Sequence, residues 1–269
     1  MNEGRAWQLD GSAAELYERC VRRYILGPWV PQLLDVVGLQ AGENVLDIAC
    51  GTGTVARVAA QRVGASGRVT GLDVNAGMLA VARSQPVPPG AAITWVDRDA
   101  RDTGLPDRDF DVVLCQQGLQ FFLDKTGALR EMRRVFVPRG RLAISVWRST
   151  GVYNVAVGKA LSQHMGVDVG SRFCASRDVP GDEELRHFAV AAGFHDVTLH
   201  VQRMMVRLPS LRDFVLRHLA ATPVASDVKA MSGAARAALG GDVARQLAAY
   251  NKDDGVAFPE EVNVVTAIA

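Results

Sequence analysis

The stretch that decides the fold of this chain is Asn44–Thr54, which reads NVLDIACGTGT. Its first part, 44–49, is mostly apolar and predicts a short buried strand. Gly51 and Gly53 follow this strand, and a helical apolar pattern begins at Val55. Because glycine has no side chain, such a turn lets a ligand approach the backbone, and the first amides of the helix are free to meet polar ligand groups. The alternative is a turn that only packs the helix on the sheet.

A carboxylate at the end of the next predicted strand supports a ligand-binding role for the glycine turn. Asp73 ends a second apolar strand, 68–72, and lies twenty residues after Gly53. An acidic side chain at this position can accept hydrogen bonds from both hydroxyls of a ribose, and such bonds are charge-assisted. The two strands together predict a site for a nucleoside-containing cofactor in a doubly wound α/β sheet.

Length and composition are those of an ordinary soluble protein. The chain has 269 residues, of which 48% are hydrophobic and 22% are charged, so it is long enough for one large domain or a domain with a lid. The 30 basic and 29 acidic residues leave a net charge of +1. This balance gives no general electrostatic attraction to nucleic acid or to a membrane surface. We expect a small-molecule substrate and no nucleic-acid partner.

The sequence also lacks the marks of secreted, membrane-spanning and metal-stabilised proteins. The N-terminal residues 1–5 do not show a basic and then apolar signal pattern, and no apolar run approaches the roughly 20 residues that span a bilayer. The cysteines are widely separated, with no Cys-x-x-Cys and no Cys/His cluster. We therefore expect a reduced, cytoplasmic protein with no metal site. The cysteines are Cys20, Cys50, Cys115 and Cys174.

Strands and helices alternate through the first 150 residues. This alternation predicts a parallel sheet with right-handed crossovers. The chain first forms two amphipathic helices within 12–38, broken at Gly27-Pro28, and Asn75 caps a short helix that ends before Pro86. Strands are expected at 44–49, 68–72, 93–96, 110–115 and 142–147, with helices at about 54–63 and 128–136.

The last 120 residues predict a different arrangement, in which helices dominate. Helices are expected near 152–165, 182–192, 210–221 and 227–250, late strands at 197–208 and 262–268, and a loop at 166–181. We expect a single domain over 1–269 in which 12–150 form the cofactor-binding core. Residues 151–269 would then supply helices that cover the substrate and the last two strands of a mostly parallel seven-stranded sheet.

The motifs between residues 17 and 147 resemble those of the class I S-adenosylmethionine-dependent methyltransferases, in particular the UbiE-like small-molecule branch. Several motifs occur in the order and spacing of that family. One departure is Pro138-Arg139-Gly140, where the family usually has Pro-Gly-Gly. After Trp147 the match holds only in outline, so the resemblance does not identify the acceptor. The motifs are VLDIACGTG at 45–53, GLDVN at 71–75 with Met78-Leu79, RDA at 98–100, LPD at 105–107, FD at 110–111 and RRVFVPRG at 133–140.

The resemblance implies S-adenosyl-L-methionine as the cofactor and a Rossmann-like sheet around it. It implies that Gly51 and Gly53 lie against the methionine and the ribose, with Asp47 near the amino group. Asp73 would bind the ribose hydroxyls. Gln116, just past the fourth strand, would face the methionine end near the methyl group.

For the adenine half of the cofactor, the resemblance implies four further residues. Val74 and Met78 would flank the adenine ring. Asp99 would accept a hydrogen bond from the adenine amino group, and the amide of Ala100 would meet a ring nitrogen.

The chemistry implied is transfer of a methyl group to a small-molecule acceptor, which we expect to be quinone-like, phenolic or a natural product. Oxygen, nitrogen and carbon acceptors are not separated by the sequence, and neither is the oligomeric state. A hydroxyl acceptor would benefit from a general base. His164 and His218, on two helices of the predicted cover, are the candidates, although the pattern favours an ordinary packing or surface histidine at each position. The catalytic residue is otherwise unknown.

Two other functions fit parts of the sequence. Gly51-x-Gly53-x-x-Ala56 also matches the loose dinucleotide fingerprint of an NAD-dependent oxidoreductase, but the sequence has no Tyr-x-x-x-Lys pair for the hydride chemistry. The protein could also bind S-adenosylmethionine in a regulatory or other non-methylating role, since fold does not settle function. A nucleic-acid methyltransferase is disfavoured, because QQGL at 116–119 stands where an Asn/Asp-Pro-Pro-aromatic motif would be.

Overall fold

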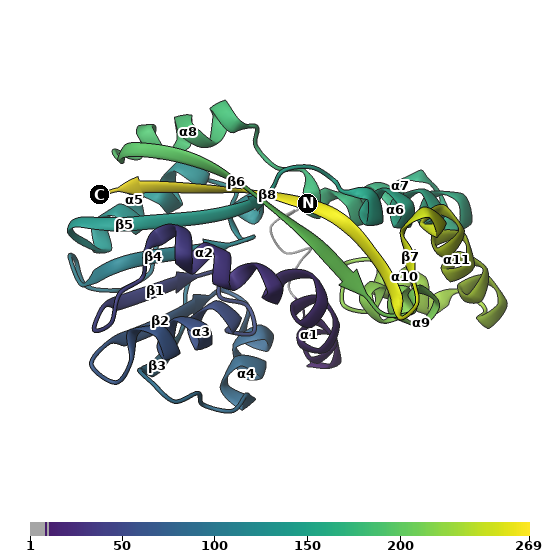
Figure 1. Ribbon diagram of the computed structural model, residues 1–269, viewed down its shortest axis with the longest axis horizontal. Coiled ribbons are helices and arrows are strands. Elements are labelled where there is room, and N and C mark those ends of the chain that lie inside the picture. Colours follow the sequence, from purple (N-terminus) through teal and green to yellow (C-terminus); the bar gives the residue numbers. More distant parts are fainter. Residues whose placement is uncertain (1–8, 10) are drawn as a thin grey trace. The chain divides into compact units, whose positions relative to one another are not determined.

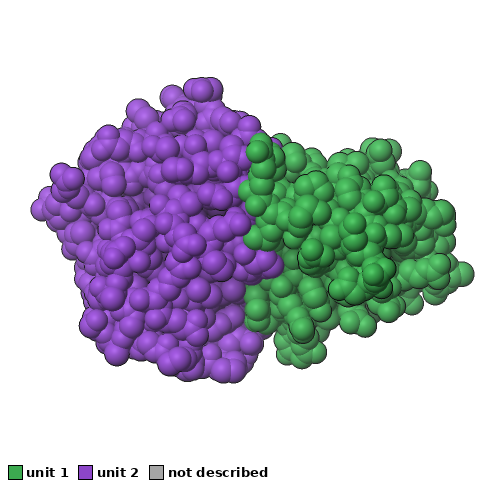
Figure 2. Space-filling model, viewed as in Figure 1, with its two compact units in different colours: residues 1–26, 149–179, 203–261 green, residues 27–148, 180–202, 262–269 purple. Residues whose placement is uncertain are grey.

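A computed structural model describes Leu9 and residues 11–269 of the chain (Figure 1). The chain divides into two compact units, each built from three segments (Figure 2). Unit 1 comprises the described residues up to Leu26 together with 149–179 and 203–261, and unit 2 comprises 27–148, 180–202 and 262–269. That the whole chain acts as one methyltransferase domain stays a prediction.

Unit 2 contains the sheet that the sequence predicts. The strand order is β3-β2-β1-β4-β5-β8-β6, in which neighbouring strands from β3 to β5 are parallel and β8 runs antiparallel to β5. The doubly wound, mostly parallel seven-stranded sheet is thereby confirmed, and a two-residue strand, β7, is added beside β8. Strands β6 and β8 both continue into unit 1. The bounds are β1 Asn44–Ile48, β2 Arg68–Asp73, β3 Ala92–Asp97, β4 Phe110–Gln116, β5 Phe136–Trp147, β6 His195–Leu208, β7 Asn251–Lys252 and β8 Gly255–Ile268.

The order of the strands reverses direction between β1 and β4. In open α/β sheets, ligands bind at the carboxyl ends of the strands that flank such a reversal. The strands at this point are buried on both faces, as a parallel sheet requires: Leu46, Val113 and Leu114 have no exposed surface. The glycine turn after β1 therefore lies where this fold usually binds its ligand.

Helices of unit 2 pack in pairs along the sheet. Helix α2 contacts α3, which also packs on β1 and β2, and α5 contacts α8. Local sequence signals set several of these helix ends. The Asn75 side chain accepts a hydrogen bond from the amide of Met78 at 3.1 Å, so the predicted cap of α4 is confirmed. The bounds are α2 Val30–Val37, α3 Thr54–Val63, α4 Ala76–Ser84, η4 Leu119–Phe121, α5 Lys125–Val135 and α8 Asp182–Ala191, with η3 at Gly27–Trp29.

Unit 1 is mainly helical. Helix α6 packs against α7, and α11 packs against both α6 and α9. Close approach of α6 and α7 depends on small residues, because a Cβ atom at Gly170 would stand 2.1 Å from Ser162 Oγ. That this unit covers the substrate stays a prediction. The bounds are α1 Gly11–Leu16, the π-helix η2 Tyr17–Leu26, α6 Val152–Met165, α7 Val167–Cys174, η5 Ala175–Arg177, α9 Leu211–Leu219, α10 Ala225–Ala230, α11 Gly233–Gln246 and η6 Ala248–Tyr250.

The predicted helix over 227–250 is wrong, because the chain forms two α-helices there. Helix α10 ends at Ala230 and α11 begins at Gly233. The hydroxyl of Ser232 accepts a hydrogen bond from the amide of Ala235 at 3.2 Å, which caps the start of α11.

The predicted loop over 166–181 is also wrong for most of its length, 167–177. This segment forms α7 and η5. Val169 and Phe173 are four residues apart and both are buried, so they lie on one face of a helix.

The fifth strand is longer than predicted, since β5 begins at Phe136 and not at Leu142. It accommodates Pro138 through a local irregularity. Arg139 has a φ of 67°, and the register against β4 shifts between Phe110 and Val112. Proline within a strand is confined to edges and bulges because it has no N–H to donate, and this irregularity is such a place.

No helix within the described part of the chain, Leu9 and 11–269, has both the length and the apolar character needed to cross a membrane.

Candidate functional site

The nine residues predicted to bind the cofactor all belong to unit 2 and come from the carboxyl ends of β1, β2, β3 and β4 or from the turns and the helix that follow these strands. The parallel sheet brings these four strand ends to one edge. The two histidine candidates, His164 and His218, belong to unit 1.

A direct hydrogen bond joins the glycine turn to the end of β2. Asp73 Oδ2 accepts a hydrogen bond from the amide of Gly51 at 2.7 Å, and Oδ1 accepts one from the amide of Asn75 at 2.8 Å. Burial raises the pKa of the Asp73 carboxyl above its usual value, and the amides of Asn75 and Gly51 oppose that rise. The amide of Val74 also donates a hydrogen bond to this carboxylate, so one of its roughly four acceptor positions remains for a ligand hydroxyl.

Asp47 lies inside β1 and holds the start of α3. Its Oδ2 accepts a hydrogen bond from the amide of Ala56 at 3.0 Å, which satisfies one of the free amides of the first helical turn. Burial raises the pKa of Asp47 to about 8, and the nearby carboxylate of Asp73 adds to that rise. A positively charged ligand group beside Asp47 would favour its ionised form.

The glycine turn adopts a backbone conformation that favours glycine. The φ angles of Gly51 and Gly53 are 54° and 79°, in the left-handed region. At Gly53, packing adds a second requirement. A Cβ atom there would stand 2.2 Å from the indole of Trp95, a side chain of β3 that also covers Gly71. This contact between β3 and the turn was not predicted, since the sequence shows Trp95 only as a strand residue.

A strained turn follows β4 beside the glycine turn. Ala49 and Gln117 are non-glycine residues with φ angles of 56° and 54°, and a Cβ atom at Gly118 would stand 2.6 Å from the Cβ of Ala49. Such strain is often found at functional sites. Gln117 lies next to the predicted Gln116, yet its special conformation carries no sequence signal.

The side chain of Gln117 supports the presence of a ligand here. Gln117 is buried, and among the residues that the structure describes neither Nε2 nor Oε1 has a hydrogen-bond partner. Buried amides nearly always bind something, whether protein, water or ligand. The amide can donate to one ligand atom and accept from another.

The turn after β3 carries the predicted adenine residues. Asp99 Oδ1 accepts from the amide of Arg101 at 2.8 Å and from its Nε at 2.9 Å, while Oδ2 accepts from Nη2 at 2.9 Å. These bonds from Arg101 lower the pKa of Asp99, so the carboxylate is ionised at neutral pH. Ala100 follows and is 9% exposed.

Apolar side chains lie beside Asp73 at the start of α4. Val74 is 54% exposed, which is unusual for a large apolar residue at a strand end, and Met78 is 7% exposed. An exposed apolar side chain next to the Asp73 carboxylate suits contact with a flat aromatic ring. The side chains fit the expected cofactor, because Asp47 could meet a cation, Asp73 could accept from a diol, and Asp99 is a third carboxylate that could accept from an amino group.

The two histidines have partners within unit 1. His164 Nε2 lies 2.5 Å from Asp242 Oδ2. His218 is buried, and its Nδ1 lies 2.8 Å from the hydroxyl of Tyr153. Burial lowers the pKa of His218 to about 3, and the positive charge of Arg177 adds to this effect, so the imidazole is a weak base. A catalytic role for either histidine stays a prediction.

Comparison with known proteins finds similarity to methyltransferases. The family model described as "Methyltransferase domain" matches residues 45–140. The ubiquinone/menaquinone biosynthesis C-methyltransferase UbiE of Ectopseudomonas mendocina is 34% identical over 186 residues, covering 64% of this chain and 73% of that enzyme.

Solved structures share the fold. A SAM-dependent methyltransferase from Aquifex aeolicus has a TM-score of 0.53 at 15% identity, covering 96% of this chain and 99% of that one. The phosphoethanolamine N-methyltransferase 2 of Haemonchus contortus, solved with S-adenosyl-L-methionine, has a TM-score of 0.53 at 20% identity, covering 90% of this chain and 52% of that one. At these identities the likeness shows the fold alone.

Proposed function

The chain belongs to the class I S-adenosylmethionine-dependent methyltransferases, in the UbiE-like branch, and we propose that it transfers the methyl group to a carbon atom of a quinone-like small molecule. Methyl transfer from S-adenosylmethionine to a small molecule is the function of this family. The choice of a carbon acceptor and of a quinone-like ring goes further. It rests on the similarity to an enzyme named as a ubiquinone/menaquinone C-methyltransferase.

The observation that carries the proposal is the bond between the Gly51 amide and the Asp73 carboxylate at 2.7 Å. This bond holds the Asp73 carboxylate against the turn at which the sheet order reverses, which supports a role for Asp73 in binding a diol. Asp73 would bind the ribose, Gly51 and Gly53 would lie along the ribose and methionine, and Asp47 would meet the amino group. Gln116 would lie at the methionine end.

For the adenine, Val74 and Met78 would supply the apolar neighbours and Asp99 would accept from the amino group, while the Ala100 amide donates to a ring nitrogen. The four residues belong to the β2 and β3 ends and to α4, all within unit 2. Adenine recognition thus depends on two turns that the sheet already holds side by side, since β2 pairs with β3 as far as Asp73 and Asp97.

When bound, the cofactor supplies an electrophilic methyl carbon on a sulfonium, and the leaving group is a neutral thioether. The residues of the chain then have two tasks, which are to hold the acceptor in line with that carbon and to exclude water. The Gln117 side-chain amide, which has no partner among the described residues, would bind a carbonyl or hydroxyl group of the acceptor, because it can donate through Nε2 and accept through Oε1.

A carbon atom of a hydroxylated ring becomes nucleophilic when the hydroxyl proton leaves, so a general base would accelerate the reaction. His164 is the better of the two candidates, because Asp242 orients its imidazole and the pKa of His218, at about 3, makes that imidazole a weak base.

The test is a methyl-transfer assay with cofactor carrying a deuterated methyl group and a panel of quinols that lack a ring methyl, with phenols and amines alongside. We expect labelled product from a quinol, with the label on ring carbon by mass spectrometry and NMR. His164→Ala should slow the step, whereas His187→Ala, which changes an exposed histidine of unit 2, should not. Label found only on oxygen or nitrogen would contradict carbon methylation, and binding without turnover on any acceptor would favour a non-methylating role.

A further inference from the structure

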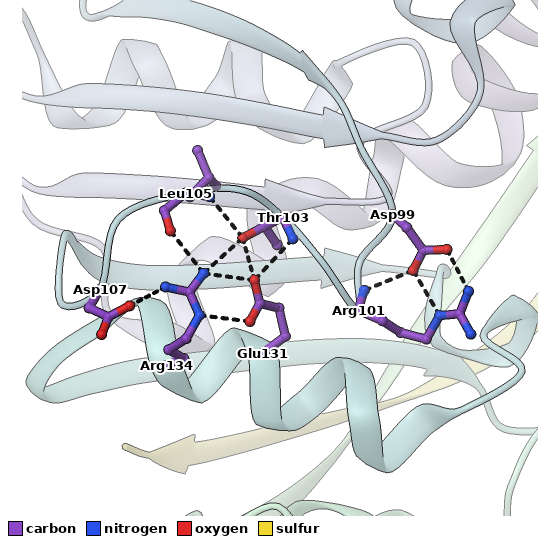
Figure 3. Close-up of polar contacts among 7 residues, drawn as sticks. All are labelled: Asp99, Arg101, Thr103, Leu105, Asp107, Glu131 and Arg134. Carbon is purple, nitrogen blue, oxygen red and sulfur yellow. Dashed lines mark hydrogen bonds and ion pairs between the residues drawn. The ribbon is translucent and has the colours of Figure 1, made fainter.

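The turn that follows β3 is fixed to helix α5 by polar contacts that lie outside the predicted cofactor residues (Figure 3). Thr103 lies in this turn and is 1% exposed. Its amide donates a hydrogen bond to Glu131 Oε1 at 3.0 Å, and its hydroxyl donates to the same oxygen at 2.6 Å. Both donors of a buried threonine therefore meet one carboxylate oxygen of α5.

Arg134 holds the Glu131 carboxylate from its own helix. Nε donates to Glu131 Oε2 at 2.8 Å and Nη2 donates to Oε1 at 2.7 Å. Nη2 also donates to the backbone oxygen of Leu105 at 2.8 Å, and Nη1 contacts Asp107. Bidentate pairs of this kind are geometrically specific. The bonds from Arg134 lower the pKa of Glu131 to about 2, so the Glu131 carboxylate keeps its charge at neutral pH.

Thr103 lies four residues after Asp99, and a backbone hydrogen bond closes the turn between them. The amide of Asp102 donates to the backbone oxygen of Asp99 at 3.1 Å, and the two residues form an isolated bridge. Arg101 binds both oxygens of the Asp99 carboxylate. Because Oδ1 accepts two bonds and Oδ2 accepts one, Oδ2 keeps a lone pair for a ligand.

We propose that Thr103 and Glu131 are positioning residues for recognition of the cofactor's purine amino group. They hold the turn against α5. The backbone hydrogen bond between Asp99 and Asp102 and the bonds from Arg101 then fix the position of the Asp99 carboxylate. This inference rests on the proposed function, in which Asp99 accepts from the adenine amino group. The ligand class is a 6-aminopurine nucleoside. A hypoxanthine base has a carbonyl oxygen in place of the amino group. This oxygen and the Asp99 carboxylate are both acceptors, so they would not form a hydrogen bond.

The test compares two ligands on four proteins by isothermal titration calorimetry. The ligands are S-adenosylhomocysteine and its analogue with hypoxanthine in place of adenine. The proteins are the wild type, Thr103→Val, Thr103→Ser and Thr94→Val. Thr103→Val keeps the shape and removes the hydroxyl, Thr103→Ser keeps the hydroxyl, and Thr94→Val makes the same change at an exposed position of β3.

We expect the wild type to prefer the adenine ligand. Thr103→Val should weaken binding of that ligand by about tenfold, the size of one buried hydrogen bond, because Asp99 would lose its bond to the purine amino group. Binding of the hypoxanthine ligand should weaken by less than about twofold. Thr103→Ser and Thr94→Val should bind both ligands within about twofold of the wild type.

Two results would overturn the inference. One is an equal loss for both ligands in Thr103→Val, which would mean that Thr103 only stabilises the fold, a point that urea unfolding of the same proteins checks. The other is no loss for either ligand. Failure of the wild type to bind S-adenosylhomocysteine at all would instead overturn the proposed function, and this inference with it.

Discussion

Replacing Gly53 by alanine should destabilise unit 2 through two separable effects. The first is conformational, because a φ of 79° costs an L-residue about 1–2 kcal/mol. The second is steric, because the new Cβ atom would stand 2.2 Å from the Trp95 indole. That ring cannot retreat freely, since the same side chain covers Gly71 so closely that a Cβ atom there would stand 2.4 Å from it. Overpacking of this kind costs about 1–3 kcal/mol, so the total should be about 2–5 kcal/mol.

The measurement is the free energy of unfolding in urea for Gly53→Ala, Trp95→Phe and the double variant. Gly38→Ala is the matched control, because Gly38 has a φ of 66° and nothing lies within 4 Å of a Cβ atom placed there. That control should lose only the conformational part, about 1–2 kcal/mol. In the Trp95→Phe background the cost of Gly53→Ala should fall toward the same value. A cost of Gly53→Ala equal to that of Gly38→Ala, or unchanged by Trp95→Phe, would refute the reasoning.

Three further predictions concern buried ionisable groups. The pKa of Asp47 is raised to about 8. If its carboxylate binds the cofactor's ammonium group, the affinity for the cofactor measured by calorimetry should rise with pH up to about 8, and Asp47→Asn should remove that dependence. A pH-independent affinity of the wild type would contradict this prediction. The pKa of His218 is lowered to about 3, so between that value and about 6.5 the unfolded chain binds a proton that the folded chain does not. The free energy of unfolding in urea should therefore fall as the pH drops below about 6.5, and it should fall less in His218→Gln. Equal pH profiles for the two proteins would contradict this prediction. Glu260→Ala removes the ion-pair partner of the buried Arg177, 3.1 Å away, and should lower the free energy of unfolding in urea by about 3–5 kcal/mol. Glu261→Ala breaks the more exposed pair with Arg203 and should cost about 1 kcal/mol or less. Equal costs for the two variants would contradict this prediction.

The sheet could be predicted because its signals are local. The apolar run before Gly51 predicts β1 and its turn, and Asn75 predicts the start of α4. The missed features depend on a single side chain or on contacts from elsewhere in the chain. Ser232 separates α10 from α11 by one capping hydroxyl within an otherwise helical pattern. Phe136 starts β5 early because a bulge accommodates the proline after it.

The candidate site shows the same division. Asp73 could be predicted from its distance to the glycine turn, since the sheet fixes where a strand end lies. The covering of Gly53 by Trp95, the strained turn at Gln117 and the anchoring of Thr103 by Glu131 could not be predicted. Each depends on which side chain a neighbouring element brings close, and no spacing along the chain encodes it.

The central claim is that the carboxyl ends of β1 and β2 bind S-adenosylmethionine through Asp73. Calorimetric titration of the wild type and Asp73→Ala with S-adenosylmethionine, S-adenosylhomocysteine and NAD tests it most directly, with Asp35→Ala as a control at an exposed carboxylate. The account predicts that the wild type and Asp35→Ala bind the first two ligands and not NAD. Asp73→Ala should lose at least about tenfold in affinity, because charge-assisted bonds to the ribose are removed. Binding of NAD alone, or wild-type affinity in Asp73→Ala, would contradict it.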